Sequence, residues 1–168
     1  MFFKAMPRLS YKAGDKTILS KDIFRRVGLD RRINSKLALQ AYYVKDGETP
    51  EMLANNFYST SKYHWILLTV NDIVNVNEEW PKSQALLYDY AQLKYGTENI
   101  LNDHHYRLTA NTSITVDYDA TAINDGTIQA VSNLDYEIDE NEKKRQIYIL
   151  KPEFLAQFVT NYKSLMAQ

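Results

Sequence analysis

Residues 43–73, with the sequence YVKDGETPEMLANNFYSTSKYHWILLTVNDI, decide the fold that we expect for this chain. A β-rich run, 40–44, leads into the stretch. The residues that follow, Lys45-Asp46-Gly47-Glu48, predict a tight turn, since Asp-Gly readily supplies the positive φ that a reversal needs. Thr49 is then a good N-cap, and Pro50 at the first helical position loses no hydrogen bond. The stretch therefore begins with a strand, a turn and a capped helix.

Two short helices are expected after this turn. Leu53, Ala54 and Phe57 recur at helical spacing, which predicts one buried stripe on a first helix. Thr60 or Ser61 caps a second helix that ends at Asn71-Asp72. On this second helix we expect one face formed by Trp65, Leu68 and Thr69, with Ile66 and Val70 beside it.

The rest of the chain predicts further helices and strands. Ser83 caps a helix that runs to Tyr95 and ends at Gly96, with an apolar stripe of Leu86, Leu87, Tyr90 and Leu93. Residues 99–139 are typical of β-structure, and residues 139–145 of a solvated loop. Residues 146–150 predict a short strand. Pro152 then opens an amphipathic helix with apolar positions at Phe154, Leu155, Phe158, Val159, Tyr162, Leu165 and Met166. Near the N-terminus, Ser20 can cap a short helix over 21–27.

Composition limits the class of protein. A chain of 168 residues is the size of one domain, or of one domain with appendages. Its 45% apolar and 24% charged residues are near the globular average, and the absence of cysteine excludes disulfides, thiolate metal sites and cysteine nucleophiles. No apolar run approaches the ~20 residues of a bilayer span, and the first residues lack a secretory signal. We therefore expect folding in a cytoplasm and no membrane partner.

The residues that could carry chemistry do not form a catalytic or metal-binding pattern. His104 and His105 are adjacent, so on an extended strand they are expected to point to opposite faces and not to share a metal. His64 beside Trp65 suits packing or the surface better than metal ligation. The 5 glycines of the whole chain argue against a phosphate-binding loop. We expect no catalytic residue, cofactor, metal or small-molecule substrate, and so no enzyme.

The net charge of -1 conceals a strong polarity along the chain. Residues 1–37 carry a net charge of +7, and residues 117–142 carry −8 without one basic residue. A basic arm of this kind docks on nucleic acid, meets an acidic protein surface during assembly, or is simply a solvated face. Interspersed apolar residues such as Phe2, Phe3 and Leu9 favour protein docking over nucleic acid. Packing of Ile23, Phe24 and Val27 on the chain's own core is the alternative.

The quoted stretch resembles a LysM module, which consists of a short strand, a K-x-G-[DE]-T turn, two helices and a closing strand. The matching positions are Tyr43, Val44, Lys45, Gly47, Glu48, Thr49, Leu53, Ala54, Phe57, Leu67, Asn71 and Ile73, and we count Trp65 with them. A helix follows here instead of a strand, so we expect residues 146–150 to supply the closing strand. The resemblance implies a LysM-like core of residues 39–73 and 146–168, an insertion of residues 74–145, and a basic docking arm of residues 1–38.

Further motifs extend the resemblance over more than half of the chain. They are AYYVK (41–45), TPEMLANNFY (49–58), YHWILLTVNDI (63–73), EWPKS (79–83) and ENEKKRQIYIL (140–150). Together they resemble the baseplate wedge protein family of contractile-tailed bacteriophages known as gene product fifty-three. The resemblance implies a non-enzymatic structural subunit of the virion tail baseplate, assembled in the host cytoplasm, that joins neighbouring wedges and other baseplate proteins into a sixfold ring.

The expected fold is therefore α+β: a LysM-like βααβ core with a helical and β-rich insertion, an N-terminal extended arm and a C-terminal amphipathic helix. We expect the following residues to bind other wedge subunits: Phe2, Phe3, Arg25, Arg26, Arg31, Arg32 and Trp80, the last as a packing or interface anchor. No nucleic-acid partner is expected. The alternative function is a LysM-type module of a tail-associated lysin that binds N-acetylglucosamine polymers of peptidoglycan. The insertion would block or rebuild the glycan groove, and Trp65 amid Phe57, Leu67 and Leu68 suits core packing better than sugar stacking.

Overall fold

The computed structural model describes residues 6–22 and 37–167, which divide into two units of a mixed α+β fold. The first unit contains the described residues up to Tyr43, together with Glu48–Glu79 and Ile147 onwards. The second unit contains Val44–Gly47 and Trp80–Gln146. The described residues form three small sheets and seven α-helices.

The first unit has a hairpin followed by a βααβ arrangement. Its elements are β1 (Arg8–Ala13), β2 (Lys16–Lys21), β3 (Leu39–Tyr43), α1 (Pro50–Tyr58), the 3-10 turn η2 (Ser61–Tyr63), α2 (His64–Val70), α3 (Val76–Glu79), β7 (Gln146–Leu150, whose first residue falls in the second unit), η3 (Pro152–Phe154) and α7 (Leu155–Ala167). The cap predicted for α1 is confirmed, because Thr49 Oγ1 accepts from Met52 N. Thr60 Oγ1 accepts from Lys62 N and so caps the 3-10 turn η2, whereas α2, for which this cap was predicted, begins after Tyr63 without a side-chain cap.

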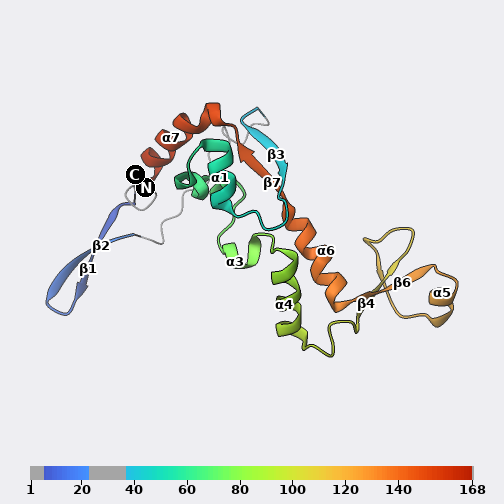
Figure 1. Cartoon of the computed structure of the whole chain (residues 1–168). Coiled ribbons are helices and arrows are strands. Elements are labelled where there is room, and N and C mark those ends of the chain that lie inside the picture. The colour runs from blue at the N-terminus through green and yellow to red at the C-terminus, as the bar shows by residue number, and fades with distance from the viewer. Residues whose placement is uncertain (1–5, 23–36, 168) are drawn as a thin grey trace. The chain divides into compact units, whose positions relative to one another are not determined.

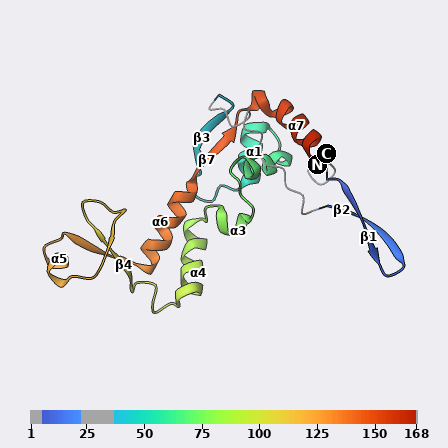
Figure 2. The same cartoon turned by 180° about the vertical axis from the view of Figure 1, so that it is seen from behind.

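Strands β3 and β7 pair in a two-stranded sheet, although about a hundred residues separate them in the sequence. Lys151 N donates to Ala38 O at one end and Val44 N donates to Arg145 O at the other, each at 2.9 Å, so the strands run antiparallel. Both views show the two strands side by side (Figures 1 and 2). The pairing of residues 40–44 with residues 146–150 predicted from the sequence is confirmed.

The core of the first unit lies between α2, β7 and α7. It is formed by Met6, Ala38, Ile66, Val70, Leu150, Phe158, Tyr162 and Met166. The apolar stripe predicted for the last helix is largely confirmed, because all its members except the half-buried Leu165 belong to this cluster or pack against it. Each large apolar side chain buried in this way contributes about 1.5–3 kcal/mol. A two-stranded sheet is marginal alone, so these helices stabilise it.

The second unit packs two helices together and carries a small antiparallel sheet. Its elements are α4 (Gln84–Tyr95), β4 (Asp103–Leu108), β5 (Thr115–Val116), α5 (Ala120–Asn124), β6 (Ile128–Ser132) and α6 (Asn133–Arg145), with strand order β5-β4-β6. Helices α4 and α6 lie side by side in both views (Figures 1 and 2). The predicted cap of α4 is confirmed, since Ser83 Oγ accepts from Leu86 N.

Several predictions from the sequence are wrong. Residues 133–145 form helix α6 instead of β-structure and a solvated loop, because Ser132 caps it and Lys143, Lys144 and Arg145 complement its C-terminal dipole. Ser20 and Lys21 lie in β2, so Ser20 does not cap a helix there. On α4 the buried residues are Leu87 and Ala91, whereas Leu86 and Leu93 are exposed. On α2 the buried side chains are Ile66, Leu67 and Val70, and the face of Trp65, Leu68 and Thr69 beside them is half-buried.

Candidate assembly surfaces

The segment from β3 into α1 carries most of the predicted LysM-like motif. Tyr43 ends β3 with an exposed side chain, and Lys45 and Gly47 lie exposed in the turn that follows. Gly47 has a φ of 74°, in the left-handed region where a side chain is strained. Thr49 caps α1, and Leu53 is fully buried. These residues set the local structure and form no pocket-like cluster of reactive groups.

Asn71 links the end of α2 to β7 through its side-chain amide. Its Nδ2 donates to Leu67 O and to Tyr148 O, each at 2.8 Å, and its Oδ1 accepts from Tyr148 N at 2.7 Å. One amide thus satisfies both backbone groups of a strand residue on the edge of β7. A side-chain amide suits this position because the arrangement needs a donor and an acceptor on one planar group.

The two tryptophans are both packing residues. Trp65 is half-buried, with its ring centroid 4.8 Å from that of Tyr162 and 6.1 Å from that of Phe158. Trp80 is only 6% exposed. These environments favour core packing of Trp65, and they favour the packing alternative over the interface alternative for Trp80.

A chain of buried polar contacts runs along α6. Glu137 accepts from Lys94 Nζ at 2.6 Å and from Tyr95 Oη at 2.8 Å, which fixes α6 to α4. Burial alone would raise the pKa of Glu137, but the hydrogen bonds from Lys94 and Tyr95 outweigh it, and the pKa lies below its usual value. Asn141 exchanges two hydrogen bonds with the backbone of Lys82.

Arg145, at the C-terminal end of α6, holds the turn after β3. It is 5% exposed, and it donates to Val44 O at 3.1 Å and to Asp46 Oδ1 at 3.0 Å. Its Nε lies 2.8 Å from Glu142 Oε1 as an ion pair without hydrogen-bond geometry. Burying a guanidinium is tolerated because it is paired on several sides.

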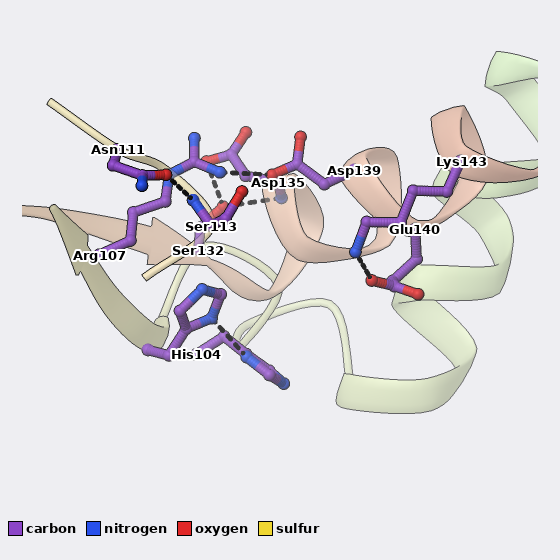
Figure 3. A network of polar contacts seen from close by, with 10 residues as sticks. His104, Arg107, Asn111, Ser113, Ser132, Asp135, Asp139, Glu140 and Lys143 are labelled. Carbon is purple, nitrogen blue, oxygen red and sulfur yellow. Dashed lines mark hydrogen bonds and ion pairs between the residues drawn. The ribbon is translucent and has the colours of Figure 1, made fainter. Parts of the chain in front are cut away.

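Ion pairs with basic residues neutralise several carboxylates of the acidic segment 117–142. Asp139 pairs with Arg107 at 2.5 Å, and Glu140 pairs with Lys143 (Figure 3). With Glu137 and Glu142 also paired, the carboxylates of α6 act mainly within their own unit. The acidic segment is therefore not one uniform docking surface.

His104 and His105 do not point to opposite faces as predicted. Their Nδ1 atoms lie 2.9 Å apart, because β4 is irregular between Asp103 and His105 (Figure 3). The ring of His104 stacks on Tyr136 with centroids 3.9 Å apart. Burial, followed by the charge of His104, lowers the pKa of His105. Within the described part of the chain, no cluster of three or more His, Cys, Asp or Glu residues could hold a metal ion.

The most exposed element is the hairpin of β1 and β2. Every residue of both strands is exposed. Gly14, with a φ of 61°, opens the two-residue loop, a position where hairpins favour glycine. Strands 8–13 and 16–21 and their loop carry a net charge of +3. The alternation of Leu9, Tyr11 and Ala13 ahead of Gly14-Asp15 was the sequence signal that could have predicted this hairpin.

The predicted docking residues of the arm fall outside the described residues. They are Phe2, Phe3, Arg25, Arg26, Arg31 and Arg32, and their predicted role stays a prediction. The same holds for the alternative packing of Ile23, Phe24 and Val27. Across residues 6–22 and 37–167, no helix has both the length and the hydropathy to cross a membrane.

A small α+β scaffold that carries a fully exposed basic hairpin is typical of a protein that works by binding other proteins. Comparison with known proteins agrees with this class. The family described as base plate wedge protein 53 matches residues 1–114. Baseplate wedge protein gp53 of Enterobacteria phage T4 is 29% identical over 167 residues, which cover 89% of this chain and 85% of that protein. The chain belongs to the base plate wedge protein 53 family and is a non-enzymatic structural component of a phage tail baseplate.

Proposed function

We propose that this wedge protein joins neighbouring wedges and other baseplate proteins into a sixfold ring, and that the β1–β2 hairpin is a principal docking element. The observation that carries the proposal is the exposure of every residue in both strands. A two-stranded ribbon is marginally stable alone and gains stability when a partner covers it. A ring also needs each subunit to present two dissimilar surfaces.

The strand register divides the hairpin into two unlike faces. Tyr11 lies directly opposite Ile18, and cross-strand partners share a face. Leu9, two residues before Tyr11, lies on that face as well. The exposed fractions are 52% for Leu9, 51% for Tyr11 and 41% for Ile18. We call these three residues the apolar face, and it is suited to pack against another baseplate protein.

The remaining N-terminal residues extend this docking element. Phe2, Phe3, Arg25, Arg26, Arg31 and Arg32 combine apolar anchors with guanidinium groups, which suits a protein interface. On this proposal residues 1–38 form the docking arm, which binds partners during assembly in the host cytoplasm.

We also propose that residues 39–73 and 146–168 form a LysM-like core, which is interrupted by an insertion of residues 74–145. Its support is the β3–β7 pairing together with the Thr49 cap and the Asn71 link. We assign this core a scaffolding role, since Trp65 packs on Tyr162 and Phe158 and is not a freely presented sugar platform.

The test removes the apolar face without removing strand propensity. Leu9→Thr with Ile18→Thr places β-branched polar residues in the ribbon, and Leu101→Thr with Val74→Thr makes a comparable change at exposed positions outside residues 1–38. Each variant is supplied during infection by phage lacking the wild-type gene, and complete baseplates are counted by electron microscopy. We expect loss of baseplates for the hairpin variant only. Normal assembly by that variant, with the protein present in particles, would refute the docking role.

A further inference from the structure

The second face of the hairpin differs from the apolar face. Arg8 and Lys12 lie four residues apart on one side of β1. Lys21 is the cross-strand partner of Arg8, and Thr17 is that of Lys12. Leu19 lies opposite Ser10 on the same side and is 59% exposed. We call Arg8, Lys12, Leu19 and Lys21 the basic face. A cationic rim around one exposed leucine suits a partner surface that is acidic and contains apolar groups.

The second unit of the same chain contains such a surface. Residues 109–132 hold Asp117, Asp119 and Asp125 and no basic residue, and all three aspartates are exposed. Tyr118 and Ile114 in the same segment are 63% and 44% exposed. We call residues 109–132 the acidic lobe. Its carboxylates differ from those of α6, which are largely paired with basic residues of their own unit.

Within the described sheet, β5 contributes an edge to this lobe. The strand order is β5-β4-β6, so β5 has a strand neighbour on one side only. An edge strand is a site where another chain can lie alongside. Asp117 and Tyr118 directly follow β5, which places charge and an exposed ring at the end of that edge.

We propose that the basic face of the hairpin binds the acidic lobe of a second copy of this protein. The net charges of the two segments, +3 for residues 8–21 and −3 for residues 109–132, are equal and opposite. The two surfaces are different parts of the chain, so the contact is heterologous and can propagate from copy to copy around a ring. The proposal deepens the wedge-joining function: the apolar face binds another baseplate protein while the basic face binds the next copy.

The experiment is a charge swap read by sedimentation velocity on the full chain. One variant, Arg8→Glu with Lys12→Glu, reverses the basic face. A second, Asp117→Lys with Asp125→Lys, changes the net charge of the lobe from −3 to +1 and leaves the Asp119 cap of α5 in place. The control, Asp89→Lys with Glu98→Lys, makes the same change in net charge as the second variant at exposed positions outside the acidic lobe. Protein concentrations extend to about 0.5 mM, which detects contacts of weak affinity.

We expect the wild-type protein to self-associate with increasing concentration at low salt and less so at high salt. Each reversed variant should associate about tenfold more weakly or worse, because attraction becomes repulsion. An equimolar mixture of the two variants should associate again, and so should one chain that carries all four substitutions. The control should behave as the wild type does.

Three results would overturn the proposal: a wild-type chain that stays monomeric throughout, a control as weak as the reversed variants, or a mixture that does not associate. A wild-type chain that stays monomeric but binds another baseplate protein through Arg8 and Lys12 would identify that protein as the occupant instead. Loss of baseplates in the Leu9→Thr and Ile18→Thr variant is independent of these results, so the two proposals can fail separately.

Discussion

Replacing Asn71 by leucine tests how far one side chain fixes the scaffold. Asn71→Leu removes two hydrogen bonds to β7, of 2.7 and 2.8 Å, and one of 2.8 Å to Leu67 O within the end of α2. Three bonds at a net 0.5–1.5 kcal/mol each would total about 1.5–4.5 kcal/mol. Tyr148 is 55% exposed, so water replaces part of what its backbone loses. We therefore expect a loss of about 2 kcal/mol in the free energy of unfolding, near the lower end of that range.

The two tryptophans allow each unit to be followed separately. Trp65 belongs to the first unit and Trp80 to the second. In a Trp80→Phe background, Trp65 fluorescence during urea unfolding reports the first unit. There Asn71→Leu should lower the urea concentration at the midpoint without changing the slope of unfolding free energy against urea. The matched control is Asn55→Leu, the same chemical change at an exposed position of α1.

Equal urea midpoints for Asn71→Leu and Asn55→Leu would contradict this stabilising role of the Asn71 amide. The role would also be contradicted if the loss appeared only in the signal of Trp80, measured in a Trp65→Phe background, because Asn71 and Tyr148 both belong to the first unit. A changed slope would indicate an altered unfolded or native state and not the loss of these three bonds.

Three further predictions concern single positions. Glu137→Gln should destabilise the second unit by about 2 kcal/mol, because it replaces the buried carboxylate that accepts hydrogen bonds from Lys94 and Tyr95 by a neutral amide. The folded-state pKa of Glu137 lies below the unfolded value, so this contribution to stability is present above about pH 4.5 and is lost as the pH falls through the folded-state pKa. Urea titrations should therefore show a difference in unfolding free energy between the variant and the wild type at pH 7 that disappears in acid. A difference that stays constant with pH would contradict this. Gly47→Ala should cost about 1 kcal/mol by thermal unfolding, since its φ of 74° strains a side chain, and an unchanged midpoint would argue against the turn conformation. Leu93→Gln should leave the free energy of unfolding within about 0.5 kcal/mol of the wild type, because Leu93 is 89% exposed. A loss of stability typical of a core residue would instead support the buried apolar stripe predicted from the sequence.

The central βααβ arrangement could be predicted because its signals are local. The Asp46-Gly47 turn, the Thr49 and Thr60 caps and the alternation in 146–150 depend on neighbours in the sequence. The predicted LysM resemblance then supplied the long-range pairing of β3 with β7, which local signals do not contain. The resemblance to the baseplate wedge family, predicted from motifs, is confirmed by the match over residues 1–114.

Helix α6 was missed because its sequence is almost entirely polar. Asn133–Arg145 contains eight charged residues, so no apolar stripe marks a buried face. The buried face instead consists of Glu137, Asn141 and Arg145, at four-residue spacing, and each is stabilised by partners remote in sequence. Hydrophobic periodicity cannot find a helix that packs through paired charges.

The prediction of a buried apolar stripe on α4 was wrong for the opposite reason. Leu86, Tyr90 and Leu93 have the spacing of a buried face, yet they are exposed, because α4 packs on α6 through Leu87, Ala91 and the Lys94–Glu137 pair. The hairpin was missed because its strands bury nothing in the isolated chain, so charge dominated the interpretation of residues 8–21. Residues that serve an assembly need not obey the pattern of a monomer.

The most direct test of the account measures whether assembly covers the hairpin. The chain contains no cysteine, so Ile18→Cys introduces a single thiol on the apolar face. The rate of its reaction with a maleimide is compared between the free protein and purified baseplates, with denatured baseplates as the control for complete labelling. The account predicts rapid labelling of the free protein and strong protection in the baseplate; equal rates in both would contradict it.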